Sequence, residues 1–315
     1  MELRQLRYFV AIVDHGSLSR AAAMLHVAQP ALTQQLRQLE EELGAQLLHR
    51  SAQGVLSTDA GKVFYEHALA ILKQVADARS AVTQSATRPS GSVTVGLPHS
   101  ISGALALPLL TATREQFPEI TLQLTEELTG NLAEQLKSGR VNLAVLFDDG
   151  QLSPFVCTPL AEEELRYLCR ADMAPPDDGN GITLSDALST QLILPGMQHG
   201  VRPRIEAVAR GAGLATSNVI EINSIAILKS AILAGMGATI LPVAPVLAEV
   251  EHGAMRALPI HSPSISRTVV LCGSKNIPLT NAAAAVSRLI CQVAADLCRS
   301  GYWLGARLLD SGAGP

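Results

Sequence analysis

The stretch from Ser19 to Leu43, SRAAAMLHVAQPALTQQLRQLEEEL, decides the fold of the first part of the chain. It divides into two short helical segments around a tight joint at residues 25–28. Pro30 falls in the first turn of the second segment, where its missing N–H would be unpaired in any helix. Ala21, Ala22 and Leu25 give the first segment one apolar face. The stretch therefore predicts two helices that meet at a sharp turn.

The second segment has one apolar side and one polar side. Its predicted buried stripe consists of Val27, Ala31, Leu32, Leu36, Leu39 and Leu43. Gln29, Thr33, Gln34 and Arg37 lie on the opposite side, near the helix start. A polar, amide-rich helix front on a small apolar core is typical of a helix-turn-helix recognition helix. The alternative is an ordinary solvated helix in an all-α domain.

A short hairpin is predicted directly after this helix. Residues 47–50 read as a strand, Gln53 and Gly54 form the turn, and residues 55–56 return. Such a hairpin is a wing, so the domain at residues 1–58 is predicted to be a winged helix-turn-helix. Arg50, at the base of the wing, can reach a phosphate or the minor groove, and a plain surface arginine is the alternative.

The first sixty residues also carry a family pattern. The matching positions are Leu6, Tyr8, Phe9, Gly16–Ser19, Ala21, Ala22, Leu25–Thr33, Leu39, Glu40, Leu43, Gly44, Leu47, Leu48, Arg50 and Thr58–Gly61. In these residues the chain resembles the LysR-type transcriptional regulators. Within that family, its residue pattern is most similar to the nitrogen assimilation control type. Thr33 stands where the family usually has Ser, and Leu48 where it usually has Phe. The resemblance implies DNA contacts by Gln29, Pro30, Ala31, Thr33, Gln34, Arg37, Arg50 and Thr58.

A long linker helix is predicted over residues 59–87, with Thr58 as its cap and Asp59 in its first turn. Apolar residues recur along it in alternating steps of four and three, which indicates a seam for a partner helix. The predicted dimerisation residues are Phe64, Ala68, Ile71, Val75, Ala78 and Val82. A second stripe, Tyr65, Leu69, Leu72 and Ala76, could pack on the winged domain. The alternative is that the helix is packed within its own chain.

Beyond a hinge at residues 88–91, strands and helices alternate, which predicts α/β structure with parallel sheets covered by helices. The resemblance implies a two-lobed effector domain at residues 92–300, similar to periplasmic binding proteins. Lobe I is placed at about 92–160 and 264–300, and lobe II at about 161–263. The tail at 301–315 is expected to be frayed.

Ligands of open α/β sheets bind beyond the carboxyl ends of the strands, and four loops of this domain lie there. The predicted effector-binding residues are His99, Ser100, Ile101, Ser102, Thr129, Phe147, His199 and Ser224. Helix N–H groups and hydroxyls favour a small anion at this place, without a buried Lys or Arg. The alternative is that Ser and Asn before a helix are only N-caps. This sequence has His99–Ser100 where many family members have a Ser/Thr pair.

Length and composition limit the number of domains and the class of protein. With 315 residues the chain should form two or three domains, and 48% hydrophobic residues with 17% charged ones indicates a globular protein. The net charge of −4 gives no basic patch, but phosphate contacts need only a few placed donors. No membrane span or signal peptide is evident, so a cytoplasmic protein is expected. The five cysteines lack the short paired spacing of a zinc site.

No catalytic motif is present either, because residues 96–100 lack the serine of a nucleophile elbow and Gly235 and Gly237 lack a third glycine. The sequence predicts a regulator, not an enzyme, without metal or cofactor. Its expected partners are promoter DNA, further copies of itself in a homodimer or homotetramer, a small anionic effector, and RNA polymerase if it activates. The alternative is the same DNA-binding regulator without an effector, controlled by its own abundance or oligomer state.

Overall fold

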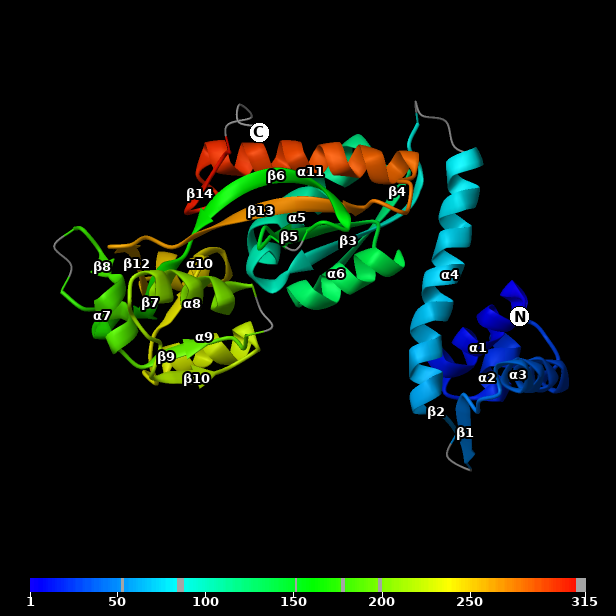
Figure 1. The fold of residues 1–315 in the computed structure, drawn as a ribbon. Coiled ribbons are helices and arrows are strands. Elements are labelled where there is room, and N and C mark those ends of the chain that lie inside the picture. Colours follow the sequence, from blue (N-terminus) through cyan, green and yellow to red (C-terminus); the bar gives the residue numbers. More distant parts are fainter. Residues whose placement is uncertain (52–53, 84–87, 151, 177–178, 198–199, 310–315) are drawn as a thin grey trace. The chain divides into compact units, whose positions relative to one another are not determined.

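The structure, a computed structural model, describes residues 1–51, 54–83, 88–150, 152–176, 179–197 and 200–309 (Figure 1). The chain divides into two compact units. Residues 1–83 belong to the first, and most of residues 84–315 to the second. None of the described helices is long and apolar enough to cross a membrane.

The first unit is a winged helix-turn-helix followed by a long helix, as the sequence predicts. Its elements are α1 (Leu3–His15), α2 (Leu18–Met24), α3 (Gln29–Leu43), β1 (Leu48–Ser51), β2 (Gly54–Ser57) and α4 (Asp59–Thr83). Strands β1 and β2 pair antiparallel as the wing. Gly44 ends α3 in the left-handed conformation that favours glycine at a helix end.

The core of this unit confirms part of the predicted stripe on α3. Leu32, Leu36 and Leu39 are buried, since they recur at steps of four and three on one side of the helix. Ala31 and Leu43 are exposed, so their place in the buried stripe is a wrong prediction. Ala31 lies on the outward side of the helix, and Leu43 lies beyond the last turn that the core covers.

Helix α4 contributes its first turns to the same core. The ring of Phe64 packs edge-on against Phe9 with 5.2 Å between centroids, and Ala68 is 0% exposed within the cluster. Ala68 therefore has no exposed surface for the predicted dimer seam, and Phe64 packs against the core of the winged unit with part of its side chain. Tyr65 and Leu72 pack against this core as predicted, and the Tyr65 hydroxyl donates to Asp14 Oδ1 at 2.5 Å.

The second unit begins with lobe I, a six-stranded sheet in the described part of the chain, with the order β14-β6-β13-β5-β3-β4. Its strands are β3 (Gly91–Pro98), β4 (Ile120–Glu127), β5 (Leu143–Phe147), β6 (Phe155–Glu164), β13 (Ser266–Ser274) and β14 (Ala306–Arg307). Its helices are α5 (His99–Gln116), α6 (Thr129–Ser138) and α11 (Asn281–Ser300).

Both faces of this sheet are covered by helices. Along β5, Leu143, Val145 and Phe147 face the cluster with α5 and α11, whereas Ala144 and Leu146 face the cluster with α6. Because side chains of a strand alternate between faces, a strand buried on both sides is apolar throughout, and LAVLF is such a run. In Figure 1, α11 runs along the sheet on one side and α6 lies on the other.

Lobe II has two sheets in the described part of the chain, a four-stranded one with the order β11-β7-β12-β8 and a two-stranded one of β10 and β9. Its strands are β7 (Arg166–Arg170), β8 (Ile182–Thr183), β9 (Leu192–Leu194), β10 (Val219–Glu221), β11 (Thr239–Leu241) and β12 (Met255–His261). Its helices are the 3-10 turns η1 (Ala171–Met173) and η2 (Ala244–Val246), with α7 (Leu184–Ser189), α8 (Val201–Gly211), α9 (Ile225–Leu233) and α10 (Leu247–Glu251). Strands β9 and β10 are parallel, and β7 is antiparallel to both β11 and β12.

The prediction of parallel sheets is thus only partly right. In lobe I, β3 is parallel to β4 and β5, but β13 is antiparallel to both β5 and β6. The chain returns from lobe II along β13, directly beside β5, and this return has no crossover helix to make it parallel. The lobes are joined at Leu165 and residues 262–265, and Leu165 N donates to Ile265 O at 2.9 Å. The first crossing lies later than predicted because β6 continues to Glu164 within lobe I.

The described part of the tail is ordered, against the expectation that it is frayed. Trp303 is buried in the core of lobe I, and β14 pairs with β6. The predicted boundary at 300 therefore divides a packed segment.

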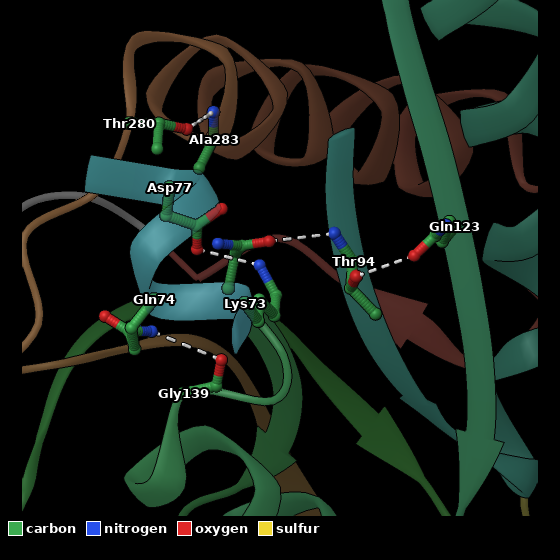
Figure 2. A network of polar contacts seen from close by, with 9 residues as sticks. Lys73, Gln74, Asp77, Thr94, Gln123, Gly139, Thr280 and Ala283 are labelled. Atoms are coloured by element: carbon green, nitrogen blue, oxygen red, sulfur yellow. Dashed lines mark hydrogen bonds and ion pairs between the residues drawn. The ribbon is translucent and has the colours of Figure 1, made fainter. Parts of the chain in front are cut away.

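Polar side chains hold β3 and the N-terminus of α11 in lobe I. The Thr94 amide donates to Asn142 Oδ1 at 2.9 Å, and its hydroxyl donates to Gln123 Oε1 on β4 at 3.1 Å. Thr280 Oγ1 accepts from Ala283 N at 3.1 Å and caps α11. Figure 2 shows these contacts together with the i,i+4 pair of Lys73 and Asp77 on α4, at 2.8 Å.

Replacing Phe64 with Ala should lower the unfolding free energy of the first unit by about 3 kcal/mol, because a partly buried ring that packs against Phe9 is lost. Val63→Ala, at a 61% exposed site on the same helix, should change it by less than about 0.5 kcal/mol. Urea unfolding followed by circular dichroism measures this, while fluorescence of Trp303, the single tryptophan, follows the second unit alone. If the Phe64→Ala variant formed a smaller oligomer but kept the unfolding free energy of the wild type, Phe64 would belong to the dimer seam.

Candidate functional site

The outer side of α3 presents the residues predicted to contact DNA. Gln29, Pro30, Ala31, Gln34 and Arg37 are exposed, and Thr33 is half-buried. Gln29 Oε1 accepts from Ser19 Oγ at 3.1 Å, and Arg37 pairs with Glu41 at 2.7 Å on the same helix. The amide of Gln34 has none of these ties and can donate and accept together, as reading an adenine requires.

The N-terminus of α3 is open. Its N-cap residue, Ala28, has no side chain to accept from the first N–H groups, and Pro30 occupies the second helical position. Uncapped N–H groups at a helix start bind anions, and the phosphate backbone of DNA is one. The joint before α3 is tight, with His26 at a φ of 54°.

The wing is attached to the helices by specific hydrogen bonds. Glu40 Oε1 accepts from Leu47 N at 2.8 Å and Leu48 N at 3.2 Å, and Val55 N donates to Gly16 O at 3.0 Å. A Cβ on Gly54 would lie 2.7 Å from Gly16 O, so only glycine fits there. Arg50 lies in β1, opposite Val55, and its side chain is outside the described part of the structure.

Thr58 has a structural role that conflicts with its predicted DNA contact. Its hydroxyl donates to Gln46 O at 2.7 Å and accepts from Gly61 N at 2.9 Å. The second contact caps α4, as predicted. Because both contacts hold the hydroxyl against the backbone, the geometry gives it no free donor for a phosphate.

In the second unit, the four predicted loops meet at one small crevice between the lobes, of about 40 Å³. It lies at the carboxyl ends of β3, β4, β9, β10 and β11, where the rule for open α/β sheets places a ligand. A larger cleft of about 790 Å³ adjoins it, bordered by α6, α8 and β13. Thr129, Phe147, Gly200 and Arg267 line both spaces.

The predicted effector residues divide into two groups. His99, Ser100, Thr129 and Phe147 line the crevice. Ile101 is buried in the core of lobe I because it points inward from the first turn of α5. Ser102 lines a different hollow, on the other side of α5, and its hydroxyl contacts Glu126. Ser224 caps α9 by accepting from Ile227 N at 3.4 Å, and His199 lies outside the described residues.

An arginine that the sequence analysis missed lines the crevice. Arg267 is 5% exposed, and its Nε and Nη2 donate to Glu163 Oε2 at 2.8 and 2.6 Å. Nη2 also donates to Ser100 Oγ at 2.8 Å, and Cζ lies 3.6 Å from the ring centroid of Phe147. Burial lowers the pKa of the guanidinium, whereas Glu163 raises it. The crevice, which was expected to need no buried Lys or Arg, is therefore lined by one.

The carboxylate that holds this arginine is itself buried. Glu163 is 0% exposed, and its Oε1 accepts from Trp303 Nε1 at 2.8 Å. One signal of this cluster was present in the sequence. Ile265, Arg267 and Val269 alternate along one side of β13, and a strand position between two buried apolar residues is itself buried.

Comparison with known proteins identifies the class. Residues 3–62 match the family described as bacterial regulatory helix-turn-helix protein, lysR family, and residues 86–295 match the LysR substrate binding domain. The nitrogen assimilation regulatory protein nac of Klebsiella aerogenes is 38% identical over 293 residues, which cover 92% of this chain and 94% of that protein.

Solved structures agree in fold. Full-length OxyR from Pseudomonas aeruginosa matches with a TM-score of 0.69 at 22% identity, covering 100% of this chain and 99% of that one. Full-length CbnR in complex with its target DNA matches with a TM-score of 0.55 at 23% identity, covering 93% and 100%.

The chain is a DNA-binding transcriptional regulator built from a helix-turn-helix head and a substrate-binding domain. It belongs to the LysR family of transcriptional regulators, which confirms the predicted resemblance. The members of this family are regulators and not enzymes, as the sequence predicts.

Replacing Thr58 with Ala should lower the stability of the first unit by about 1 kcal/mol, because the first turn of α4 loses its cap. DNA affinity at a temperature well below unfolding should stay unchanged. Urea unfolding and fluorescence anisotropy with labelled DNA give the two quantities. A large loss of affinity at unchanged stability would restore Thr58 as a DNA contact.

Proposed function

We propose that this regulator binds an interrupted inverted repeat in promoter DNA, in the cytoplasm, as a homodimer or homotetramer. Helix α3 enters the major groove, and Gln29, Thr33 and Gln34 face the base edges. The observation that carries the proposal is the exposed amide-rich side of α3 beside an uncapped N-terminus. Arg37 on α3 and Arg50 on the wing are proposed to contact phosphates of the DNA backbone. The similarity to regulators of nitrogen assimilation supports promoters of nitrogen metabolism as first targets.

The seam of the dimer is assigned to the outer part of α4. Ile71, Val75, Ala78 and Val82 keep the four-three spacing after Phe64 and Ala68 are removed from it. Ile71 is 37% exposed and Val82 is 87% exposed, so apolar surface is available on this side. Two linked winged units then bind DNA more tightly than one does. This gain offsets the weak attraction for DNA of a unit that has no net positive charge.

The substrate-binding domain is assigned a small anionic metabolite between its lobes, and the bound regulator contacts RNA polymerase if it activates. An effector of this kind acts through unequal affinity for two states of the protein. The second candidate is a regulator without an effector, controlled by its abundance or oligomer state. One observation favours it, because the crevice, at about 40 Å³, is much smaller than the pockets of about 300–1,000 Å³ that usually hold small ligands.

Replacing Gln34 with Ala should weaken binding to the specific site by about 1–3 kcal/mol, because bidentate contacts to a base are lost. Binding to unrelated DNA should hardly change. Anisotropy titrations with both DNA types measure this, and Gln116→Ala, at an exposed glutamine of the second unit, is the matched control. Equal losses on both DNA types would mean that Gln34 does not read bases.

Replacing Ile71 and Val75 together with Glu should break the linker dimer, because like charges would face their own copies in the seam. Sedimentation at micromolar concentration should show smaller species with weak DNA binding. Val156→Glu, at an exposed apolar site on β6, is the control and should keep the mass of the wild type. An unchanged mass in the double variant would place the seam elsewhere.

A further inference from the structure

Two thiols meet within lobe I, apart from the spaces between the lobes. Cys157 on β6 and Cys272 on β13 have 2.9 Å between their sulfur atoms. Both are free cysteines, and neither lines the crevice or the larger cleft. They are 115 positions apart in the sequence, and all of lobe II lies between them. The pair therefore brings two distant segments of the chain together.

The strands hold the two thiols in register. β6 and β13 are antiparallel neighbours (Figure 1), and Cys272 is the direct partner of Cys157. Direct partners in an antiparallel pair have Cα atoms about 4.5 or 5.5 Å apart, and disulfides span Cα separations of about 4.4–6.8 Å. Closing the gap from 2.9 Å to the roughly 2.05 Å of a disulfide bond therefore needs little movement of the backbone.

The two thiols differ in their access to solvent. Cys272 is 0% exposed, in an apolar cluster that includes Leu132 and Leu136 of α6. Cys157 packs against this cluster but is only half-buried. Burial raises the pKa of the Cys272 thiol. A reagent from solution therefore reaches Cys157 first, and Cys272 is a poor nucleophile toward anything but a sulfur held beside it.

The other three cysteines provide a comparison within the same molecule. Cys291 and Cys298 both lie on α11, and seven residues of helix separate them by about 10 Å along the axis. Cys169 is buried in the core of lobe II. Burial raises the pKa of all three thiols. Cys291 and Cys298 are too far apart to bridge each other, so the reaction of the first pair can be distinguished from general oxidation.

We infer that Cys157 and Cys272 form a reversible disulfide by exchange with a small disulfide, RS–SR, such as oxidised glutathione. The Cys157 thiolate attacks one sulfur of RS–SR, the bond between its sulfurs breaks, and RS⁻ leaves. Cys272 loses its proton, attacks the Cys157 sulfur and releases the second RS⁻. The two thiol protons convert both RS⁻ ions to RSH. The protein is oxidised by two electrons and the small disulfide is reduced, and this reaction requires neither DNA nor an effector.

The bond would join the two strands that connect lobe I to lobe II. β6 ends just before the first crossing at Leu165, and β13 begins just after the return at Ile265. A disulfide between them closes a long loop that contains lobe II, and closing a long loop restricts the unfolded chain strongly. Because both sulfurs lie in lobe I, the bond requires no movement of one lobe against the other. Oxidation should therefore stabilise the folded second unit.

The test uses the full chain, first reduced and then equilibrated with mixtures of reduced and oxidised glutathione. Free thiols are alkylated with iodoacetamide in denaturant and counted by intact mass. The reduced protein should take up five groups and the oxidised protein three, because two of the five cysteines are consumed. Peptide mapping should find Cys157 linked to Cys272. The unfolding temperature, followed by fluorescence of Trp303, should rise by roughly 5–10 °C on oxidation and return with dithiothreitol.

Three variants locate the reaction. Cys157→Ala should abolish both the disulfide and the rise in unfolding temperature. Cys272→Ala should accumulate a mixed disulfide of glutathione with Cys157, because the second thiol that would release glutathione is missing. Cys291→Ala is the matched control and should form the bond as the wild type does. If Cys272→Ala does not fold, Cys157→Ala at its half-buried site still decides the question.

Several results would overturn the inference. One is that all five thiols stay free in every glutathione mixture. Another is a disulfide that links other cysteines, or one that forms in Cys157→Ala as readily as in the wild type. A third is a bond that forms only after the protein is unfolded in urea, or that lowers the unfolding temperature. In each of these cases the two thiols would serve only to fill the core of lobe I.

Discussion

The buried carboxylate of Glu163 is the constraint on which lobe I depends. It accepts from Arg267 on β13 and from Trp303 in the tail, while β6 carries it into the core. A buried charge is tolerable only when it is paired and hydrogen-bonded, and removing one partner costs about 3–5 kcal/mol. The same bonds that make the carboxylate tolerable also fix the guanidinium against Phe147. Stability of the lobe and geometry of the crevice therefore come from one set of contacts.

The winged unit depends on a different principle, the sharing of one apolar core between the head and the helix that leaves it. Phe9 of α1 meets Phe64 of α4, and Ala68 closes the contact one turn later. Glu40 links α3 to the wing through two backbone amides. With the wing and α4 both fixed to the three helices, the exposed side of α3 has a defined direction.

The sequence predicted the features that depend on interactions between neighbouring residues. The joint before α3, the cap at Gly44 and the covered strand at residues 143–147 follow from spacing, glycine and apolar runs. Contacts between distant segments were missed because spacing cannot show them. Arg267 meets Glu163, 104 residues away, and Cys272 lies opposite Cys157 with 2.9 Å between sulfurs. Burial raises the pKa of the Cys272 thiol. Ser102 and Ser224 do not line the crevice, because a helix start offers several hydroxyls and only packing decides which one faces it.

The continuity of α4 has a consequence for how the two heads of a dimer would be aimed. The helix is unbroken from Asp59 in the head to Thr83, beyond the residues that pack on the head core. Each residue of an α-helix turns the following side chains by about 100°. The angle between the recognition helix and the outer stripe of α4 is thus set by the number of residues between them. Helical phase, and not a flexible joint, would decide which face of the DNA each head meets.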